Sequence, residues 1–231
     1  MVVERGRSRN TVEAYRRDLM QYEMWLTTKK SDLTSVSVGE IESFLAQRLK
    51  SGAAKSSLAR QFASIRMLLR FMVEEDFRRD DPASLAEGVS KPVGIPKPLS
   101  EEEVMSALSS VTGDEPKDLR DRAVLEFLYA TGARVSEVCG LNLADLDMEA
   151  SLVRLFGKGA KERVVPFGSA AHAALEAWIV RGRPPMEPVR WRRRDDSQAV
   201  FLGGRGIRLT RQAAFLIVRH AGLRADLDRE L

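Results

Sequence analysis

Apolar residues recur three and four positions apart through most of residues 1–88, which is the spacing of one face of an α-helix. The first stripe follows Asn10, a residue type that caps helices, and consists of Val12, Tyr15, Leu19, Tyr22 and Leu26. A second helix is expected after Ser37-x-x-Glu40, the pattern of a capping box. A third is expected from about Ser56 to Val73, with an inward stripe of Leu58, Phe62, Ile65, Leu69 and Met72. A short fourth helix is expected to open at Asp81-Pro82.

A dense run of glycine and proline separates this helical segment from the rest of the chain. The run consists of Gly88, Pro92, Gly94, Pro96 and Pro98. Such a composition is typical of an extended, semi-stiff linker. Directly after it, Ser100-x-x-Glu103 repeats the capping-box pattern and marks the start of another folded segment. We therefore predict a helical domain at 1–88, a linker at 89–98 and a second domain at 99–231.

The hydrophobic period changes from helical to strand-like near residue 152. Leu152–Phe156 and Arg163–Phe167 are two expected strands, and the glycines between them suit the positive φ angles of a hairpin. A third strand is expected at Ala199–Leu202. Combined with the helices, these strands predict a fold that is mainly α with a small antiparallel β-sheet.

Helices flank the predicted strands. One is expected from about Leu119 to Tyr129. Ser169 is expected to cap a further helix, and Thr210 a last one that Gly222 closes. Between these two helices, residues 181–198 are rich in proline and arginine and predict an exposed loop without regular structure.

Composition places the chain among folded proteins and narrows its chemistry. With 231 residues, 44% of them hydrophobic and 30% charged, it can bury a sizeable core. No apolar run approaches the ~20 residues of a membrane span, and the N-terminus lacks the apolar core of a signal peptide. Cys139 is the single cysteine, and with only two histidines the sequence argues against a zinc site. We therefore expect a cytoplasmic protein with no membrane partner.

The net charge of +4 hides an uneven distribution along the chain. Residues 99–150 hold 4 Lys and Arg against 12 Asp and Glu, whereas residues 151–224 hold 15 against 5. A block of net charge +10 that follows a block of −8 indicates a local surface for a polyanion such as a nucleic acid. On charge alone, an ordinary solvated surface explains the basic block equally well.

Several common catalytic motifs do not occur in the sequence. It contains no G-x-x-x-x-G-K-[ST] phosphate loop, no G-x-G-x-x-G dinucleotide fingerprint and no G-x-S-x-G elbow. Nucleotide hydrolysis through a phosphate loop, dinucleotide chemistry and serine hydrolysis are therefore not indicated, and no cofactor is expected.

An arginine and a lysine remain as candidate catalytic residues. Arg134 precedes a short helix expected around Ser136–Leu141, where free backbone N–H groups also favour an anion, and its guanidinium can grip two phosphate oxygens. Lys158 lies at the tip of the predicted hairpin, from which an ammonium group can protonate a leaving oxygen. Together they offer a metal-free way to cleave a phosphodiester. Taken singly, each residue is more often an ordinary surface charge.

Two motifs in tandem carry a resemblance to a known family: ATGARVSEVCGLNLADLD and LVRLFGKGAKERVVPFG. They resemble the catalytic domain of the tyrosine site-specific recombinases of the XerC/XerD type, in the phage-integrase family. The helical, SAM-like core-binding domain of that family is similar to VERGRSRNTVEAYRRDLMQYEMWL and KSSLARQFASIRMLLRFMVEE. The family's interdomain joint resembles KPVGIPKPLSEEEV, so the likeness covers essentially the whole chain.

The resemblance implies site-specific DNA recombination, as in chromosome dimer resolution. DNA is then cut and rejoined through a 3′-phosphotyrosyl intermediate, without metal or nucleotide cofactor. Carried over by motif, Arg134 is the first catalytic arginine, and Lys158 is the lysine that protonates the leaving 5′-oxygen. The implied partners are a double-stranded recombination site, a second recombinase in a tetrameric synaptic complex and a DNA translocase.

The sequence departs from the family pattern after residue 224. The pattern continues with H-x-L-R-H and then the tyrosine nucleophile, whereas this sequence stops at LRADLDREL. Its tyrosines are Tyr15, Tyr22 and Tyr129, all before Arg134, and none matches the nucleophile position. We therefore expect an incomplete α+β catalytic domain that does not complete strand exchange. The alternative is a catalytically silent DNA-binding protein, or decoy, at a recombination site.

Candidate DNA contacts come from helix starts and hairpins in the basic parts of the chain. They are Lys55, Arg60, Lys161, Arg163, Arg208 and Arg211. If they face DNA, the logarithm of the duplex-binding constant falls steeply with the logarithm of salt concentration. Residues 190–194, with the sequence RWRRR, are either an arm that binds phosphates or a solvated loop.

Overall fold

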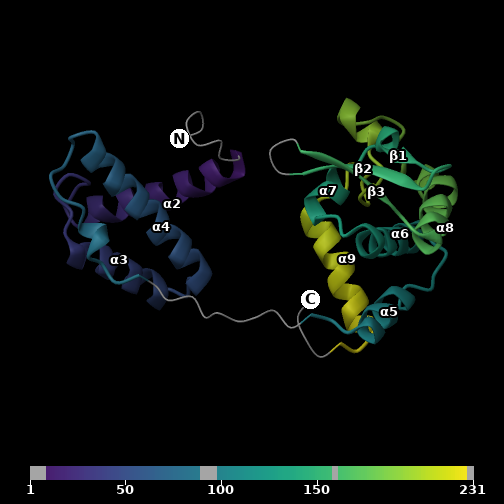
Figure 1. Cartoon of the computed structure of the whole chain (residues 1–231), viewed down its shortest axis with the longest axis horizontal. Helices are drawn as coiled ribbons and strands as arrows, with labels where there is room; N and C mark the ends of the chain where they lie inside the picture. The colour runs from purple at the N-terminus through teal and green to yellow at the C-terminus, as the bar shows by residue number, and fades with distance from the viewer. Residues whose placement is uncertain (1–8, 89–97, 158–160, 228–231) are drawn as a thin grey trace. The chain divides into compact units, whose positions relative to one another are not determined.

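The computed structural model describes residues 9–88, 98–157 and 161–227, which form two compact units. Unit 1 is Met1–Pro96 and unit 2 is Lys97–Leu231, and each has a hydrophobic core of its own. The predicted linker at 89–98 lies outside the described residues apart from Pro98. Figure 1 labels the helices and strands of both units.

Within residues 9–88, unit 1 has three helices and a short turn. The helices are α2 (Arg9–Thr28), α3 (Val38–Lys50) and α4 (Lys55–Glu74), and a 3-10 turn follows at Pro82–Ser84. The apolar stripes predicted from the sequence face one another and form the core. Its fully buried side chains include Tyr22, Leu26, Ile41, Phe44, Leu58, Ile65 and Leu69. The ring of Phe44 packs against that of Tyr22 with the centroids 4.9 Å apart.

Side-chain caps fix the starts of α3 and of the 3-10 turn in unit 1. The Ser37 hydroxyl accepts a hydrogen bond from the backbone N of Glu40 at 3.3 Å, and the Glu40 carboxylate accepts one from the backbone N of Ser37 at 2.8 Å. The predicted capping box is therefore confirmed. Asp81 caps the 3-10 turn through the backbone N of Ala83. The prediction for Asn10 is wrong, because α2 already includes the residue before it.

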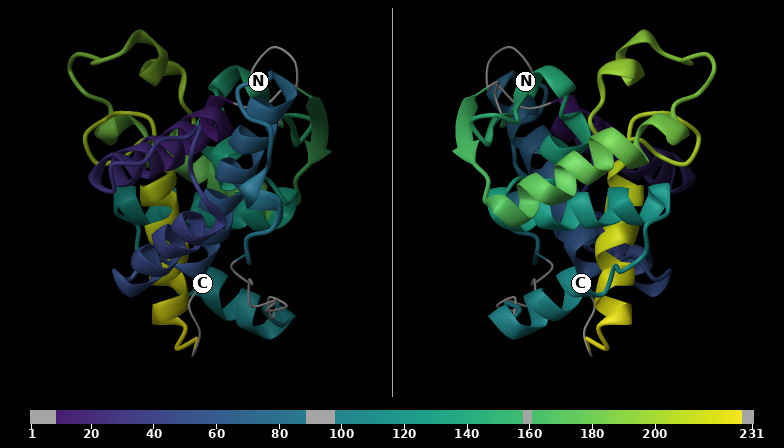
Figure 2. Two further views of the ribbon diagram at one scale, coloured as in Figure 1. Left: turned by 90° about the vertical axis from the view of Figure 1, so that its left-hand side faces the viewer. Right: turned by 90° about the vertical axis from the view of Figure 1, so that its right-hand side faces the viewer.

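Unit 2 is built around α6 (Pro116–Thr131), whose residues Ala123, Val124 and Phe127 are fully buried. Four helices contact α6: α5 (Glu101–Ser109), α7 (Val135–Gly140), α8 (Ser169–Ala177) and α9 (Arg211–Arg224). The last of these, yellow in Figures 1 and 2, also packs against α5 and α7. The short helix after Arg134 is therefore supported by the core of unit 2.

A small antiparallel sheet completes unit 2. Its strands are β1 (Leu146–Asp147), β2 (Leu152–Phe156) and β3 (Glu162–Pro166), in the order β1-β2-β3. Val153 and Leu155 are buried while the residues between and after them face solvent, the alternation of a half-buried strand. The predicted hairpin and the predicted fold class, mainly α with a small antiparallel β-sheet, are confirmed.

The predicted strand at Ala199–Leu202 is wrong. These residues are fully buried, but they bond to side chains and to single backbone partners instead of a neighbouring strand. Trp178 Nε1 donates to the carbonyl O of Val200 at 2.9 Å, and Arg183 Nε donates to that of Ala199 at 3.1 Å. The third strand of the sheet is β1, whose 2 residues are too few to produce a periodic signal.

Two predicted helix ends and one predicted loop also differ from the structure. Ser169 is the first residue of α8 and not its cap, because Gly168 occupies the cap position. Gly222 does not close α9; it is buried in the last turn, and the helix continues to Arg224. Residues 181–198 are not irregular throughout, since they contain 3-10 turns at Pro184–Met186 and Arg194–Gln198.

Gly182 provides a test of the packing of unit 2. It ends the π-turn Trp178–Gly182, and an added Cβ would lie 2.6 Å from the Trp178 ring and 3.0 Å from Leu119 Cβ. Gly182→Ala is therefore expected to lower the free energy of unfolding by about 1–3 kcal/mol. Gly140→Ala is the control, because a Cβ there meets nothing within 4 Å, and it should leave stability unchanged or slightly raised. Denaturant unfolding followed by circular dichroism distinguishes the two, and equal effects would contradict the packing.

Candidate active site and nucleic-acid interface

A fixed turn between α6 and α7 places Arg134. Gly132 adopts φ +57°, a left-handed conformation that favours glycine and ends α6. Thr131 Oγ1 donates to the carbonyl O of Phe127 at 2.6 Å and accepts from the backbone N of Ala133 at 3.2 Å. Arg134 then takes the N-cap position of α7, with its side chain 68% exposed. The turn therefore holds the backbone of Arg134 in place while its guanidinium reaches solvent.

Glu137 is the charged group that organises this site. Its side chain is only 2% exposed, and its carboxylate accepts hydrogen bonds from two guanidinium groups. Arg163 donates from Nη1 and Nη2 at 2.8 and 2.9 Å. Arg134 donates from its backbone N at 2.7 Å and from Nη1 at 3.1 Å. These donors, above all Arg163, lower the pKa of Glu137 from its ordinary 4.5 to about 2.

The bond to Arg163 couples α7 to the β2–β3 hairpin. Arg163 belongs to β3, and Gly157, directly after β2, donates from its backbone N to the carbonyl O of Lys161 at 2.7 Å. A Cβ added at Gly157 would lie 3.3 Å from that oxygen and 3.4 Å from Glu137 Oε1, so the hairpin packs closely on the carboxylate. Lys158, the predicted catalytic lysine, is the next residue and lies outside the described residues, so its role stays a prediction.

The importance of Glu137 was not recognised from the sequence. One signal was available, because a glutamate three residues after the residue that opens a helix is in capping-box position and can reach back to the backbone N–H. The sequence does not show that Arg163, 26 residues later, arrives at the same carboxylate. That contact depends on the strand register, which sets which residue of β3 faces α7.

The six predicted DNA contacts divide into exposed cations and internally bonded ones. Lys55 opens α4, Lys161 lies in the hairpin and Arg211 opens α9, and all three are exposed. The internally bonded residues are Arg60, Arg163 and Arg208. DNA binding by all six residues stays a prediction. Arg60, Arg163 and Arg208 bond to other groups of the protein, and their positions at helix starts or in the hairpin did not indicate these bonds.

Arg208 supports the end of α7 opposite Arg134. Its Nη1 donates to the carbonyl O of Leu141 at 3.1 Å, and its Nη2 donates to Asn142 Oδ1 at 2.6 Å and to the carbonyl O of Asp195 at 3.1 Å. The Arg208 guanidinium therefore links its own segment to two others, the one at Leu141 and Asn142 and the one at Asp195. Arg208 therefore stabilises the backbone around the site through these hydrogen bonds.

Arg60 likewise stabilises the packing of two elements, here in unit 1. Its Nε and Nη2 donate to the two carboxylate oxygens of Asp18 at 2.8 and 2.9 Å, which joins α4 to α2. Asp18 is buried, with a 6% exposed side chain, whereas that of Arg60 is 46% exposed. The pair therefore satisfies a buried carboxylate, and only the outer part of the Arg60 side chain is open to a ligand.

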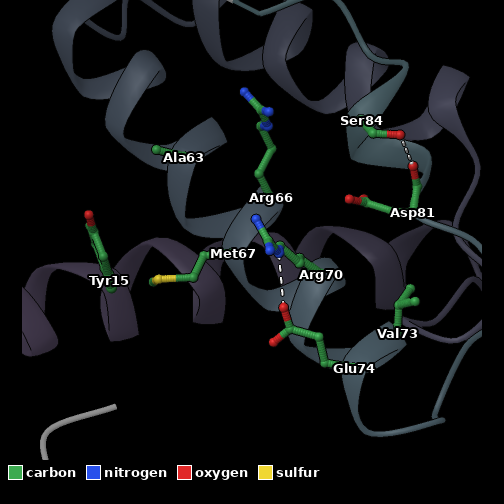
Figure 3. A pocket seen from close by; sticks show the side chains of 9 residues that line it. All are labelled: Tyr15, Ala63, Arg66, Met67, Arg70, Val73, Glu74, Asp81 and Ser84. Carbon is green, nitrogen blue, oxygen red and sulfur yellow. Dashed lines mark hydrogen bonds and ion pairs between the residues drawn. The ribbon is translucent and has the colours of Figure 1, made fainter. Parts of the chain in front are cut away.

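A hollow on unit 1 is lined by two arginines, Arg66 and Arg70, that were not among the predicted DNA contacts (Figure 3). It has a volume of about 770 Å³ and is lined by Tyr15 of α2, by the outer face of α4 and by Asp81 with Ser84. Arg66 and Arg70 extend from α4 between these two sides. Arg70 pairs with Glu74 at 2.9 Å, while Arg66 lies with its guanidinium carbon 5.7 Å from the Phe62 ring centroid. Both arginines occur on the face of α4 opposite its buried stripe.

The described residues hold neither a candidate metal centre nor a candidate membrane span. Across 9–88, 98–157 and 161–227, no group of three or more His, Cys, Asp or Glu side chains is arranged to hold a metal ion. In the same ranges, no helix has the length and apolar character needed to cross a membrane.

Solved structures of recombinases share the fold of this chain. A XerH site-specific recombinase, bound to palindromic difH substrate in a post-cleavage complex, superimposes with a TM-score of 0.73 at 19% identity. That match covers 95% of this chain and 64% of the other. A lambda integrase (75–356) dimer bound to a COC′ core site gives 0.71 at 14% identity, over 99% of this chain and 76% of the other. The fold is that of these recombinases.

Sequence comparisons assign the family. Residues 97–231 match the Phage integrase family, and residues 1–76 match the Phage integrase, N-terminal SAM-like domain. Tyrosine recombinase XerD of Proteus mirabilis is 40% identical over 228 residues, which are 99% of this chain and 71% of the relative. XerD of Mycobacterium tuberculosis (strain ATCC 25618 / H37Rv) is 40% identical over 239 residues, covering 98% of this chain and 76% of the relative. The chain belongs to the phage integrase family of tyrosine recombinases, and within it to the XerC/XerD type.

Replacement of Glu137 by glutamine tests the organisation of the site. Glu137→Gln puts an amide N–H₂ beside the Arg163 guanidinium, and it should lower the free energy of unfolding by about 1.5–3 kcal/mol near neutral pH. Since the folded-state pKa is depressed to about 2 from 4.5, the contribution of the carboxylate is present above pH 4.5 and is lost as the pH falls towards 2. The difference between wild type and variant should therefore shrink over that range.

The measurement is a series of denaturant titrations between pH 2 and pH 7. Glu149→Gln, at an exposed carboxylate with no ion pair in the part of the chain that the structure describes, is the control and should change stability little at any pH. A stability difference for Glu137→Gln that stays constant across this range would show that the carboxylate is not held by its guanidinium partners.

Proposed function

We propose that this chain binds duplex DNA at a recombination site and contributes Arg134 and Lys158 to phosphodiester cleavage of the tyrosine-recombinase kind. The observation that carries the proposal is the Arg134 guanidinium, which is exposed yet fixed at its base by Glu137 and by the turn at Gly132. Membership of the XerC/XerD type supports the same activity, because the XerD relatives are named tyrosine recombinases.

The geometry suits Arg134 to a phosphate. In the described structure only Nη1 of its guanidinium bonds to Glu137, so Nε and Nη2 are left for the two oxygens of a phosphodiester. A guanidinium held this way stabilises the charge that develops on the phosphoryl oxygens when a nucleophile attacks. The placement is preorganised, because Glu137 orients the side chain before DNA arrives.

The reaction we propose follows the family scheme. A tyrosine hydroxyl loses its proton to solvent and its oxygen attacks the phosphorus. The bond to the 5′-oxygen breaks and a 3′-phosphotyrosyl link forms, while the Lys158 ammonium gives its proton to the leaving oxygen. Rejoining reverses these steps, and Lys158 recovers the proton. In this scheme the cationic side chains of Arg134 and Lys158 stabilise the negative charge on the phosphoryl oxygens and the leaving oxygen. The closeness of the Gly157 backbone to Glu137 supports the pairing of the hairpin with Arg134 in one site.

We also propose that the nucleophile is none of the three tyrosines in this sequence. Tyr22 is fully buried in unit 1, where desolvation raises its pKa. Tyr15 also belongs to unit 1, on α2. Tyr129 lies on α6 only five positions before Arg134, whereas the family pattern puts the nucleophile long after that arginine.

A subset of the exposed cations of each unit supplies the DNA interface in this proposal. In unit 1 they are Lys55, Arg66 and Arg70 along one helix, and in unit 2 they are Lys161 and Arg211. Similar solved structures are described as a lambda integrase dimer bound to a core site and a lambda integrase tetramer bound to a Holliday junction. We therefore propose that copies of this chain, or this chain and a second recombinase, assemble on the recombination site.

Salt dependence tests the DNA-binding surface on α4. Arg66→Gln should flatten the slope of log K against log salt by about 0.9, because the variant neutralises one phosphate fewer and releases one counterion fewer. The decrease in affinity should be similar for all duplex sequences. Arg79→Gln is the matched control, since Arg79 is exposed in unit 1 outside the hollow and should leave the slope unchanged. Equal slopes for wild type and Arg66→Gln would remove Arg66 from the interface.

Arg134→Lys tests the active site. The test uses two proteins, the 231-residue chain and the same chain extended by the C-terminal segment of the Proteus mirabilis XerD. On a nicked suicide site we expect no covalent adduct from the first and an adduct from the second. In the extended chain, Arg134→Lys should reduce the adduct rate by at least about 10²-fold while gel-shift affinity changes little, because lysine lacks the bidentate fork.

Each contrary result has a distinct meaning. Cleavage by the extended Arg134→Lys protein at the parental rate would make Arg134 a structural residue. DNA binding without any adduct from the extended chain would favour a catalytically silent DNA-binding protein. Absence of duplex binding by the 231-residue chain would contradict the whole proposal.

A further inference from the structure

The guanidinium groups of four arginines in one loop of unit 2 have no partner within the described structure. They are Arg190, Arg192, Arg193 and Arg194, and all four are exposed. Across the described ranges, no ion pair or side-chain hydrogen bond involves their guanidinium groups, whereas Arg183 in the same loop has several acceptors. Like charges gathered in this way repel one another and lower stability, unless a ligand neutralises them.

The loop that carries these arginines is anchored to the core of unit 2. Arg183, only 6% exposed, donates from Nε to the carbonyl O of Ala199 at 3.1 Å and from Nη2 to that of Ser197 at 2.7 Å. Its Nη1 bonds to Glu187, and its guanidinium carbon lies 5.9 Å from the ring centroid of Trp191. One buried guanidinium therefore holds both ends of the loop and the tryptophan in the middle of the arginine run.

A second set of bonds ties the loop to the helix of Arg134. The buried Asp196 carboxylate accepts from the backbone N of Arg208 at 3.3 Å, and the carbonyl O of Asp195 accepts from Arg208 Nη2 at 3.1 Å. The same guanidinium donates to the carbonyl O of Leu141, directly after α7. The arginine run is thus joined through Arg208 to the end of α7 that lies opposite Arg134, so the loop and Arg134 belong to one connected framework in unit 2.

From this arrangement we propose that the loop 183–198 is a further phosphate-binding surface, which grips the backbone of the same duplex whose phosphate Arg134 engages. The inference rests on the proposed function. Arginine suits phosphate because its planar fork meets two oxygens at once, and four such groups match the repeated charge of a duplex backbone. An acidic protein partner would also meet four cations, but it would not account for the link between the loop and α7.

The test is a fourfold replacement, Arg190→Gln with Arg192→Gln, Arg193→Gln and Arg194→Gln. Because all four guanidinium groups are exposed and unpaired in the described structure and repel one another, the variant should keep the unfolding midpoint of the wild type or raise it slightly. Deletion of the loop is unsuitable, since it would also remove the acceptors of Arg183. The measurement is the affinity for a duplex that contains the recombination site, over a range of salt concentrations.

The expected result is a slope of log K against log salt that is flatter by about 2–4, at about 0.9 for each phosphate that the variant no longer neutralises. Phosphate-ethylation interference should show a group of backbone phosphates that the wild type binds and the variant does not. The matched control replaces the same four residues by lysine, which retains the charge and should keep most of the slope.

Other results would overturn the inference. An unchanged slope and interference pattern, in a variant that still binds the site, would show that the loop does not meet DNA. Loss of binding to a polyglutamate peptide with unchanged DNA binding would assign the loop to an acidic protein partner. If the wild type itself binds no duplex, the proposed function fails first, and this outcome differs from a failure of the loop alone.

Discussion

The carboxylate of Glu137 is the constraint on which the rest of the site depends. A buried carboxylate is stable only if hydrogen-bond donors replace its lost hydration, and here two guanidinium groups and a backbone N–H do so. Two donors, a backbone N–H and Nη1, come from Arg134 at the start of α7, and the other two come from Arg163 of β3. Satisfying a single buried charge therefore fixes the relative placement of a helix start and a hairpin, and with it the base of the Arg134 side chain.

The same principle recurs at the other end of α7. Arg183 and Arg208 donate to backbone carbonyls of segments that belong to neither helix nor sheet, such as those of Ala199 and Leu141. Buried carbonyl groups that are not bonded in a helix or a sheet need other hydrogen-bond donors. A guanidinium has five N–H groups and can donate to several carbonyls at once. Arg183 and Arg208 thus hold irregular backbone, while the exposed arginines of the loop 183–198 are left for an external anion.

How much the sequence could predict differs between fold and site. Helices with capping boxes, such as those at Ser37 and Ser100, were predicted correctly because the cap and the apolar stripe are local signals. The strand predicted at Ala199–Leu202 was wrong because an apolar run indicates burial but does not distinguish a strand in a β-sheet from a core segment that is bonded by side chains. The contacts of Arg60 and Arg208 lie 42 and 67 positions away along the chain, so no local pattern separates them from exposed arginines. The contact between Glu137 and Arg163, 26 positions apart, was missed for the same reason.

A double-mutant cycle between Glu137 and Arg163 tests the central claim most directly. The free energies of unfolding of the wild type, Glu137→Gln, Arg163→Met and the double variant give the coupling between the two side chains. With two charge-assisted hydrogen bonds at 2.8 and 2.9 Å, the coupling should be about 1.5–3 kcal/mol at pH 7 and should decline as the pH falls from 4.5 towards 2. Additive effects of the two replacements at pH 7 would contradict the account, because α7 and the hairpin would then be placed independently of this carboxylate.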